Sequence, residues 1–464
     1  MKKNLLAFLL AFAGLSAIAQ LGHGGEPSLW SDKHLPSDIP FVTTPAIDRD
    51  HLAIEDAITD QHKDVPYRFG VEHEVVFTTS SSGIWRIDAE NDKAIWQLGI
   101  ECPGALSVSI RFSEFSIPKG GNLFIWSAGR DEFIGSFDHR SNSNGGSFAT
   151  GLIHSDKVVV ELEMPISKMG EHLLAIDQIV HGYRSFLKSH FEAETQDADR
   201  GPFGDSGNCE VNVNCPEGAD WQVEKRSVAI IVEGGFGICT GALVNNTAND
   251  GTPYFLTANH CTQGSTVSNW TFYFNHESAT CSGTSAPTNN SISGSTLKAN
   301  NAYSDFALLL LDETPPANFD VEYAGWDATD SESAVSSAVC IHHPSGDIKK
   351  ISFEEDAPYH DVGNGAQVWW IDNWELGVTE PGSSGSPLFN QDHRIIGQLF
   401  GGASACSGNN GNGQFDFYGR FGQSWDHSAS NSAQLQHWLD PGNTGVFVLN
   451  GYPEGFVSAQ LDAS

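Results

Sequence analysis

The stretch that decides the fold class of this 464-residue chain is Pro381–Phe389, PGSSGSPLF. Glycines at 382 and 385 flank a serine pair, and they let the backbone turn tightly enough to expose a hydroxyl. In such a turn the amides of Gly382 and Ser384 can point at one spot, which is what the negative oxygen of a tetrahedral acyl-transfer intermediate needs. We therefore interpret Ser384 as a candidate nucleophile, with Gly382 and Ser384 as its oxyanion hole. A plain flexible Gly/Ser loop is the alternative for this segment in isolation.

Two further segments offer the partners that such a serine requires. A hydroxyl is a poor nucleophile unless an imidazole takes its proton. His260 lies near the end of the mainly apolar stretch Tyr254–Cys261 and is the candidate base. Any one of the 18 histidines would by default be a surface or core residue, so the T-A-x-H-C context is what distinguishes this one. The imidazolium then needs a buried carboxylate, and Asp305 leads into an apolar run, FALLLL. The sequence therefore predicts a catalytic triad of His260, Asp305 and Ser384.

The rest of the second half consists of short apolar runs separated by turns, such as Val228–Val232 and Ala307–Leu311. Runs of this kind indicate strands, and together they favour a pair of antiparallel β-barrels. A late amphipathic segment at about 430–439, followed by Pro441 and Gly442, predicts a C-terminal helix. We expect a mainly β fold.

The order and local contexts of the three candidate residues resemble those of chymotrypsin-like serine proteases, and most of all bacterial lysyl endopeptidases. The likeness extends from about residue 204 to 445. It includes Thr240–Thr247, Ala324–Asp327, Ile341–Pro344 and Gly377–Pro381. The resemblance implies a chymotrypsin-like double β-barrel and a secreted serine endopeptidase, made as a prepro-protein. Its substrates would be proteins or peptides, cut after lysine through an acyl-enzyme, with arginine left open as a second accepted residue.

The resemblance also implies a disulfide framework for six of the eight cysteines. The implied pairs are Cys209 with Cys406, Cys215 with Cys281, and Cys239 with Cys261. Cys102 and Cys340 have no counterpart in that set. The apolar surroundings of Cys340 favour a buried free thiol there.

Specificity for a basic residue requires an acid in the pocket that receives it. The position six residues before Ser384, where trypsin-like enzymes place this acid, is Val378 and cannot serve. Lysyl endopeptidases place the acid in an Asp-x-Tyr-Gly-Arg context, and Asp416–Arg420 reads DFYGR. Asp416 is therefore the predicted pocket acid, Glu380 is the second choice, and a solvated loop is the plain alternative.

In the lysyl endopeptidases a histidine precedes a Gly-Gly pair and stacks on a tryptophan. This sequence departs from that pattern at the histidine. Here Phe400 precedes Gly401 and Gly402. Glycines suit a strand on which a substrate pairs edge to edge, because no side chain intrudes. Trp374 is the candidate for the tryptophan. The predicted substrate-binding residues are thus Asp416, Phe400, Gly401, Gly402 and Trp374, and the choice between lysine alone and either basic residue stays open.

The first part of the chain has a different character. Residues 1–19 carry two lysines, an apolar run and a small-x-small end, which is typical of a signal peptide and predicts a secreted, extracellular protein. Lysine and arginine become scarcer after residue 200, where an acidic stretch meets Gly201–Gly204, so Arg200–Gly201 is a predicted processing site. Alternating runs predict a β-sandwich at about 70–190. The predicted division is 1–19 signal peptide, 20–200 pro-region and 201–464 protease domain.

Three interpretations of the chain remain open, and two of them concern the N-terminal sandwich. As a pro-region it would act as an intramolecular inhibitor or chaperone of the protease. It could instead be an adhesin or glycan binder with the protease as passenger. A third alternative is a catalytically silent relative that uses the protease fold for binding.

Composition excludes several classes of partner. The net charge of −34 would repel phosphate backbones and anionic lipid headgroups, so we expect neither nucleic acid nor membrane as a partner. No metal cluster or phosphate-binding glycine loop is visible in the sequence, so no cofactor or metal is expected. His342 and His343 are interpreted as structural.

Overall fold

Strands make up most of the regular secondary structure in the computed structural model, which describes residues 22–28, 30, 38–141, 146–184, 206–232 and 237–453. The predicted signal peptide, residues 1–19, and the predicted processing site at Arg200–Gly201 lie outside the described residues. No helix within the described ranges is long and apolar enough to cross a membrane.

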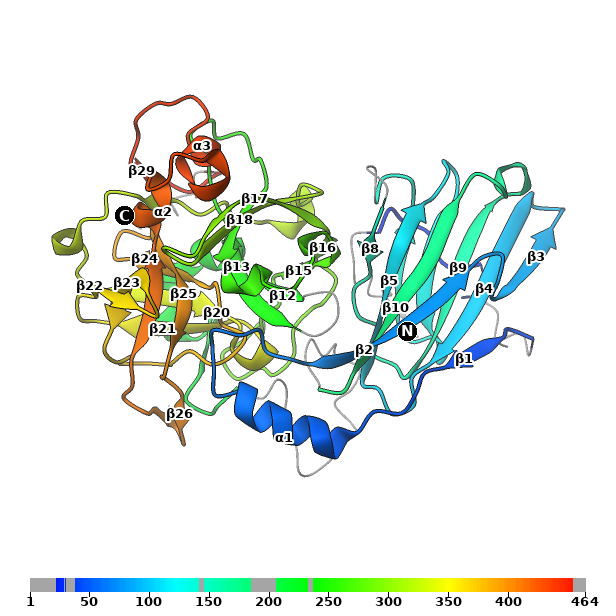
Figure 1. The fold of residues 1–464 in the computed structure, drawn as a ribbon, viewed down its shortest axis with the longest axis horizontal. Helices are drawn as coiled ribbons and strands as arrows, with labels where there is room; N and C mark the ends of the chain where they lie inside the picture. Colours follow the sequence, from blue (N-terminus) through cyan, green and yellow to red (C-terminus); the bar gives the residue numbers. More distant parts are fainter. Residues whose placement is uncertain are drawn as a thin grey trace, which may run out of the picture.

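The N-terminal half contains two sheets packed face to face (Figure 1). The first has the order β1 (Phe41–Thr43), β4 (Lys93–Glu101), β9 (Lys157–Pro165), β6 (Asn122–Ser127), β7 (Phe133–Phe137), with β3 (Ile84–Asp88) paired to β4. The second has the order β2 (Gly70–Thr78), β10 (Leu173–Gly182), β5 (Ser107–Ser116), β8 (Phe148–Ala149). Alternating apolar side chains of both sheets, such as Leu98, Val160, Phe112 and Ile179, fill one core. These residues therefore form a β-sandwich.

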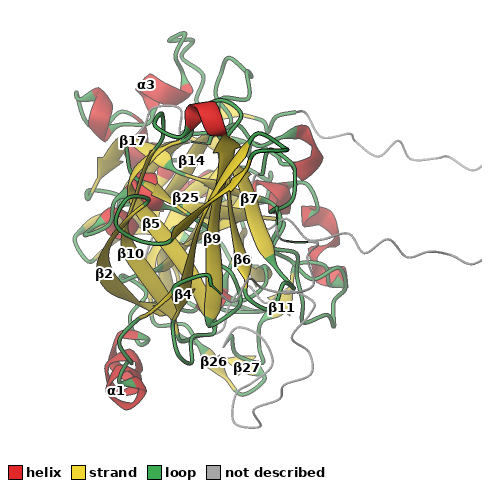
Figure 2. Ribbon diagram, turned by 90° about the vertical axis from the view of Figure 1, so that its right-hand side faces the viewer, coloured by secondary structure: helices red, strands yellow, loops and turns green. Residues whose placement is uncertain are grey.

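A helix that the sequence analysis did not predict, α1 (Arg49–Thr59), connects β1 to β2. Asp48 caps its N-terminus by accepting a hydrogen bond from the backbone amide of His51 at 3.0 Å. In Figure 1 the helix lies below the two halves of the molecule, and Figure 2 shows it clear of the sheets. The chain between α1 and β2 therefore passes along the second half before it enters the sandwich.

The C-terminal half contains two larger sheets, which are antiparallel except where β19 (Trp326–Asp327) pairs with β25 (Ile395–Gly402). The seven-stranded sheet has the order β16 (Ser291–Ser293), β15 (Thr271–Phe274), β12 (Val228–Val232), β13 (Ile238–Leu243), β14 (Tyr254–Ala258), β18 (Phe306–Leu311), β17 (Ser295–Asn301). The ten-stranded sheet runs β11 (Val211–Asn212), β21 (Lys350–Glu354), β20 (Ala338–His342), β24 (Pro387–Asn390), β25 (Ile395–Gly402), β28 (Asp416–Arg420), β23 (Ala366–Ile371), β22 (Tyr359–Gly363). β19 (Trp326–Asp327) and β29 (Val448–Leu449) join its edge, and β26 (Cys406–Ser407) pairs with β27 (Asn410–Gly411) in a small hairpin.

One core spans the two C-terminal sheets. It includes Leu256 and Leu308 from the first sheet and Ile341 and Phe389 from the second. The predicted mainly β fold class is confirmed: a sandwich is followed by two large, mostly antiparallel sheets and a short C-terminal helix. The 3-10 helices are Ile166–Lys168, Pro216–Trp221, Glu224–Ser227, His260–Thr262, Val267–Asn269, Ala317–Phe319, Glu332–Ala334, Pro344–Gly346 and Asn431–Ala433.

The predicted helix at about 430–439 is wrong in its length. The structure has a 3-10 turn at Asn431–Ala433 and then only α3 (Gln436–Leu439), after an earlier short helix, α2 (Phe421–Trp425). Local polar contacts replace a continuous helix, because the carbonyl of Asn431 accepts a hydrogen bond from the indole of Trp438 at 2.8 Å.

Candidate active site

His260 and Asp305 meet because their strands are neighbours. β14 ends just before His260 and pairs antiparallel with β18, which begins just after Asp305. The carboxylate of Asp305 accepts a hydrogen bond from the backbone amide of His260 at 2.9 Å, and its other oxygen lies 2.7 Å from Nδ1 of the ring. Burial raises the pKa of Asp305, and the charge and hydrogen bonds of His260 act in the opposite direction. The two contacts fix the ring so that Nε2 is the nitrogen left to accept a proton.

Ser384 lies in a tight turn before β24. Gly385 has φ +80°, and a Cβ there would come within 2.2 Å of Oγ1 of Thr257 and 2.5 Å of the carbonyl oxygen of Thr240, so the position requires glycine. The amide of Thr240 donates to the carbonyl of Ser384 at 2.8 Å. The turn is therefore pressed against β13 and β14, whose end carries His260. Cys261, the next residue, has its Sγ 3.9 Å from the same carbonyl oxygen.

The hydroxyl of Ser384 donates a hydrogen bond to the backbone carbonyl oxygen of Lys63, a residue 321 positions earlier in the chain. Nε2 of His260 is buried and has no hydrogen-bond partner among the described residues. Of the three residues predicted from sequence, Ser384 thus contacts a peptide carbonyl supplied by the N-terminal half, and His260 and Asp305 contact each other. Ser384 is thus a candidate nucleophile toward a peptide carbonyl, and Nε2 of His260 is free to accept a proton.

Asp416 lies at the start of β28, fully buried. Its Oδ2 accepts three hydrogen bonds, from the indole nitrogen of Trp374 at 2.7 Å, Oγ1 of Thr379 at 2.8 Å and Oγ of Ser404 at 2.6 Å. Its Oδ1 pairs with the ammonium of Lys63 at 2.8 Å. One oxygen is thus saturated by neighbours, while the other is presented to a cation.

The ammonium of Lys63 has two further partners in this pocket, Oγ1 of Thr379 at 2.8 Å and Oγ of Ser404 at 2.9 Å. An ammonium carries three N–H donors, and these three oxygens satisfy all of them. The side chain of Lys63 is only 3% exposed. A buried cation of this kind needs such full pairing to offset the loss of its water.

The glycines of β25 keep this pocket open. Gly402 has φ +151°, and a Cβ there would lie 2.0 Å from Oδ1 of Asp416, the oxygen that holds the ammonium. A Cβ on Gly401 would press on the ring of Phe417 at 3.0 Å. Phe400 stacks on the ring of His260 with 5.7 Å between centroids. Phe400 therefore packs at the predicted base, while Trp374 contacts the pocket acid.

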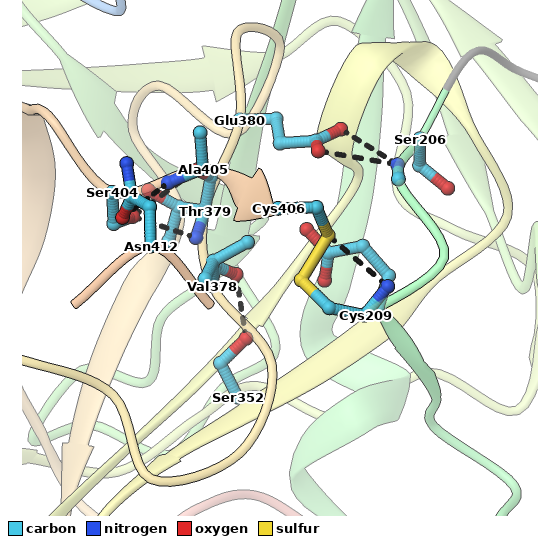
Figure 3. Close-up of a disulfide and its surroundings, with 12 residues drawn as sticks. Ser206, Cys209, Ser352, Val378, Thr379, Glu380, Ser404, Ala405, Cys406 and Asn412 are labelled. Atoms are coloured by element: carbon cyan, nitrogen blue, oxygen red, sulfur yellow. Dashed lines mark hydrogen bonds between the residues drawn. A yellow bond between two sulfur atoms is a disulfide. The ribbon is translucent and has the colours of Figure 1, made fainter. Parts of the chain in front are cut away.

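Glu380, the second choice for the pocket acid, faces elsewhere. Its carboxylate accepts hydrogen bonds from the backbone amide of Gly207 at 3.1 and 3.2 Å and from Oγ of Ser345 at 3.1 Å. Figure 3 shows it directed at the segment that begins near Ser206. Glu380 thus holds the first described residues of the C-terminal half, and Asp416 is the carboxylate that contacts the lysine.

Three disulfides join the pairs that the resemblance implies: Cys209 with Cys406, Cys215 with Cys281, and Cys239 with Cys261. The last attaches the residue after His260 to β13. The first attaches the segment at Cys209 to β26, two residues after Ser404 of the pocket wall (Figure 3). Two of the three bonds therefore brace loops that carry site residues.

Cys102 and Cys340 are buried free thiols. Burial raises the pKa of Cys102 to about 11 and that of Cys340 to about 12. Because the thiolate is the reactive form, we expect neither to react with iodoacetamide in the native protein at about pH 8. In guanidinium without reductant both should be alkylated, as read by the mass of cysteine-containing peptides. Alkylation of either thiol in the native protein would contradict the burial seen here.

His342 is structural, as interpreted from the sequence. Its Nδ1 lies 2.8 Å from Oγ of Ser383 and its Nε2 lies 3.1 Å from Oγ of Ser352. Burial, with the charges of Lys63 and Lys350, lowers its pKa to about 3. The neutral ring therefore links the residue before Ser384 to β21.

Sequence reasoning missed three residues of this site. Thr379 lies inside a motif used for the resemblance, but nothing about a threonine beside Glu380 indicates a pocket wall. Ser404 follows the glycine pair by two residues, which is a weak signal at best. Lys63 stands in an ordinary polar segment, Gln61–Asp64, and only the fold brings it to Asp416.

The second half of the chain is similar in sequence to known peptidases. Residues 203–419 match the family model described as lysyl endopeptidase, C-terminal domain, a range that includes all four residues named above as triad and pocket acid. A lysyl endopeptidase of Pseudomonas aeruginosa is 29% identical over 341 residues, covering 69% of this chain and 71% of that protein.

Similar solved structures include two proteases. The active form of the Rv3671c protease from M. tuberculosis has 16% sequence identity and a TM-score of 0.31, with 45% of this chain and 82% of that chain covered. The HtrA-type protease AlgW with a tripeptide has 15% identity and a TM-score of 0.29, with 42% and 56% covered.

Proposed function

This chain is a serine endopeptidase similar to bacterial lysyl endopeptidases, and from that premise we propose that it cuts peptide bonds on the carboxyl side of lysine. The observation that carries the proposal is the lysine ammonium held by Asp416, Thr379 and Ser404 while the carbonyl of the same residue meets Ser384. A residue whose side chain fills the pocket and whose carbonyl meets the nucleophile occupies the position before the cut.

Each member of the triad has a role that its contacts support. Ser384 Oγ attacks the carbonyl carbon as Nε2 of His260 takes its proton. Asp305, held at 2.7 Å from Nδ1, keeps the tautomer and stabilises the imidazolium. The amides of Gly382 and Ser384 are proposed to receive the oxyanion. His260 then protonates the leaving amine, and water releases the acyl group by the same steps in reverse.

The pocket chemistry favours lysine over arginine. Its oxygens surround one point, which suits the compact ammonium with three divergent donors. A guanidinium is planar, longer and needs acceptors spread along its fork. Phe400, where the lysyl enzymes have histidine, stacks on His260, while the three donors of the ammonium are satisfied by Asp416, Thr379 and Ser404.

Two matched chromogenic peptides that differ only in lysine or arginine before the reporter group test this preference. We expect kcat/KM to be at least about a hundredfold higher for lysine, because arginine would leave buried pocket oxygens unpaired. A ratio near one would replace the lysyl proposal with a trypsin-like preference for either basic residue.

The N-terminal half is proposed to be a pro-region that inhibits the protease, and the chain is proposed to be secreted. The occupied pocket supports the first proposal, since no substrate can enter while Lys63 is there. The leader-like residues 1–19 and the three disulfides support the second. The same pocket contact favours an inhibitory role for the sandwich over that of an independent adhesin.

A further inference from the structure

The segment that crosses the active site has the geometry of a bound substrate on both sides of one peptide bond. Lys63 fills the pocket, and its carbonyl accepts from Ser384. Asp64, the next residue, is exposed, and its charge contributes to raising the pKa of Asp305. Farther along, the amide of Tyr67 donates to the carbonyl of Ile238 on β13 at 3.2 Å. The chain therefore enters the pocket, passes the triad and leaves along the seven-stranded sheet.

We propose that the bond between Lys63 and Asp64 is a self-cleavage site, cut within the same molecule by Ser384. This inference rests on the proposed function. Ser384 Oγ would bond to the carbonyl carbon of Lys63, and the bond to the nitrogen of Asp64 would break. His260 passes the serine proton to that nitrogen, which becomes a new amino terminus. Water then hydrolyses the ester, leaving Lys63 with a free carboxylate and restoring Ser384.

A clamp of charged side chains joins the chain on the two sides of this bond. Asp56 of α1, which precedes the bond, is 2% exposed. It pairs with Nη2 of Arg68 at 2.6 Å and Nη2 of Arg184 at 2.9 Å, and it accepts from the hydroxyl of Tyr183 at 2.7 Å. All three partners follow the bond in sequence. Asp60 adds a second contact with Arg184 at 2.8 Å.

The chain after the bond is also fixed to the protease half by apolar packing. Tyr67 and Phe69 pack in one cluster with Val180 of the sandwich and with Ile230 and Ile238 of the seven-stranded sheet. Hydrolysis of one peptide bond removes none of these contacts. Both new ends would therefore stay in place, with the carboxylate of Lys63 beside Ser384 and the new amine near enough to be rejoined.

The consequence is a cut chain that remains inhibited. Among the described residues no disulfide joins the two fragments, so noncovalent contacts alone keep Lys63 in the pocket. These contacts are the Asp56 clamp beside the bond and, farther back in the chain, the pairing of β1 with β4. The clamp residues hold the segment around Lys63 in position and take no part in the chemistry. They touch neither the nucleophile nor the base.

The experiment compares the full-length wild type with two variants of the full chain, Ser384→Ala and Lys63→Gln. A third variant, Lys119→Gln, replaces an exposed lysine and serves as the matched control. Mass spectrometry of the denatured wild type and of Lys119→Gln should show one fragment ending at Lys63 and another beginning at Asp64. Both should be absent from Ser384→Ala and Lys63→Gln. The fraction cut should be independent of protein concentration, as an intramolecular reaction requires. An intact bond in the wild type would overturn the proposal.

The clamp is tested by Asp56→Asn and Arg184→Gln, with Asp50→Asn on the exposed face of α1 as control. In native size exclusion the cut fragments of all these proteins should elute together, because β1 of the first fragment stays paired with β4 of the second. Hydrolysis of a small lysyl chromogenic substrate should rise about a hundredfold in the clamp variants, because a broken buried ion pair no longer holds the segment. Using two clamp positions guards against a single variant that fails to fold.

The outcomes separate this inference from the proposed function. If no variant hydrolyses the lysyl substrate in a Ser384-dependent way, the proposed function fails. If such activity is present but the wild type is uncut at Lys63, or if the clamp variants stay as inhibited as the wild type, only the self-cleavage inference fails.

Discussion

Ser384→Ala is expected to lower kcat/KM toward lysyl peptides by about six orders of magnitude, the loss seen when the nucleophile of a coupled triad is removed. The Ser384 hydroxyl contacts the carbonyl oxygen of Lys63, and the contact of His260 with Asp305 leaves Nε2 free to take the hydroxyl proton. Because Lys63 blocks the pocket of the wild-type chain, initial rates on a chromogenic lysyl peptide are compared between Asp56→Asn, in which the segment is released, and the Asp56→Asn, Ser384→Ala double variant.

Ser407→Ala is a suitable control, because Ser407 is exposed on β26. In the Asp56→Asn background it should leave the activity unchanged. An Asp56→Asn, Ser384→Ala protein within tenfold of Asp56→Asn would show that another residue is the nucleophile, and the proposed roles of His260 and Asp305 would then fail with it.

Asp416→Asn should lower kcat/KM for lysyl substrates by about two to three orders of magnitude, the cost of leaving a buried charge unpaired. The arrangement of donors makes this substitution especially harmful. Trp374, Thr379 and Ser404 all donate to Oδ2, so the amide oxygen of the asparagine would turn toward them. Its NH2 group would then face the lysine ammonium, donor against donor.

The matching control is Asp426→Asn, an exposed carboxylate just after α2, which should leave the lysine preference unchanged. The measurement is kcat/KM on the lysine peptide and on a matched peptide with an uncharged residue of similar length. Selectivity between the two should collapse in Asp416→Asn. An unchanged ratio would mean that a different group reads the cation.

Local signals account for what the sequence predicted well. Ser384 stands between glycines whose conformations are required by close packing, and Asp305 precedes an apolar strand, so each candidate had a signature within a few residues. The strands at Ser107–Ser116 and Lys157–Pro165 likewise follow from alternation of polar and apolar residues. The disulfide pairs were implied by a resemblance, since spacing alone does not determine connectivity.

What the sequence could not predict depends on contacts between distant segments. Lys63 and Asp416 are 353 positions apart, and neither neighbourhood indicates the other. The helix at 430–439 was predicted from periodicity, but the carbonyl of Asn431 is used by Trp438. For α1 a local signal did exist, since Asp48 is a good N-cap residue. Polar and apolar residues are mixed along this helix, however, so the apolar periodicity that predicts a helix is weak.

The most direct test of the account is to digest a peptide library derived from whole proteomes and to identify the residue that precedes each cut. The account predicts lysine at that position in cuts by the Asp56→Asn protein, whose loosened clamp lets Lys63 leave the pocket, with none made by the Asp56→Asn, Ser384→Ala double variant. Ser384-dependent cuts spread over arginine or uncharged residues would contradict the assignment of Asp416, Thr379 and Ser404 as a lysine pocket.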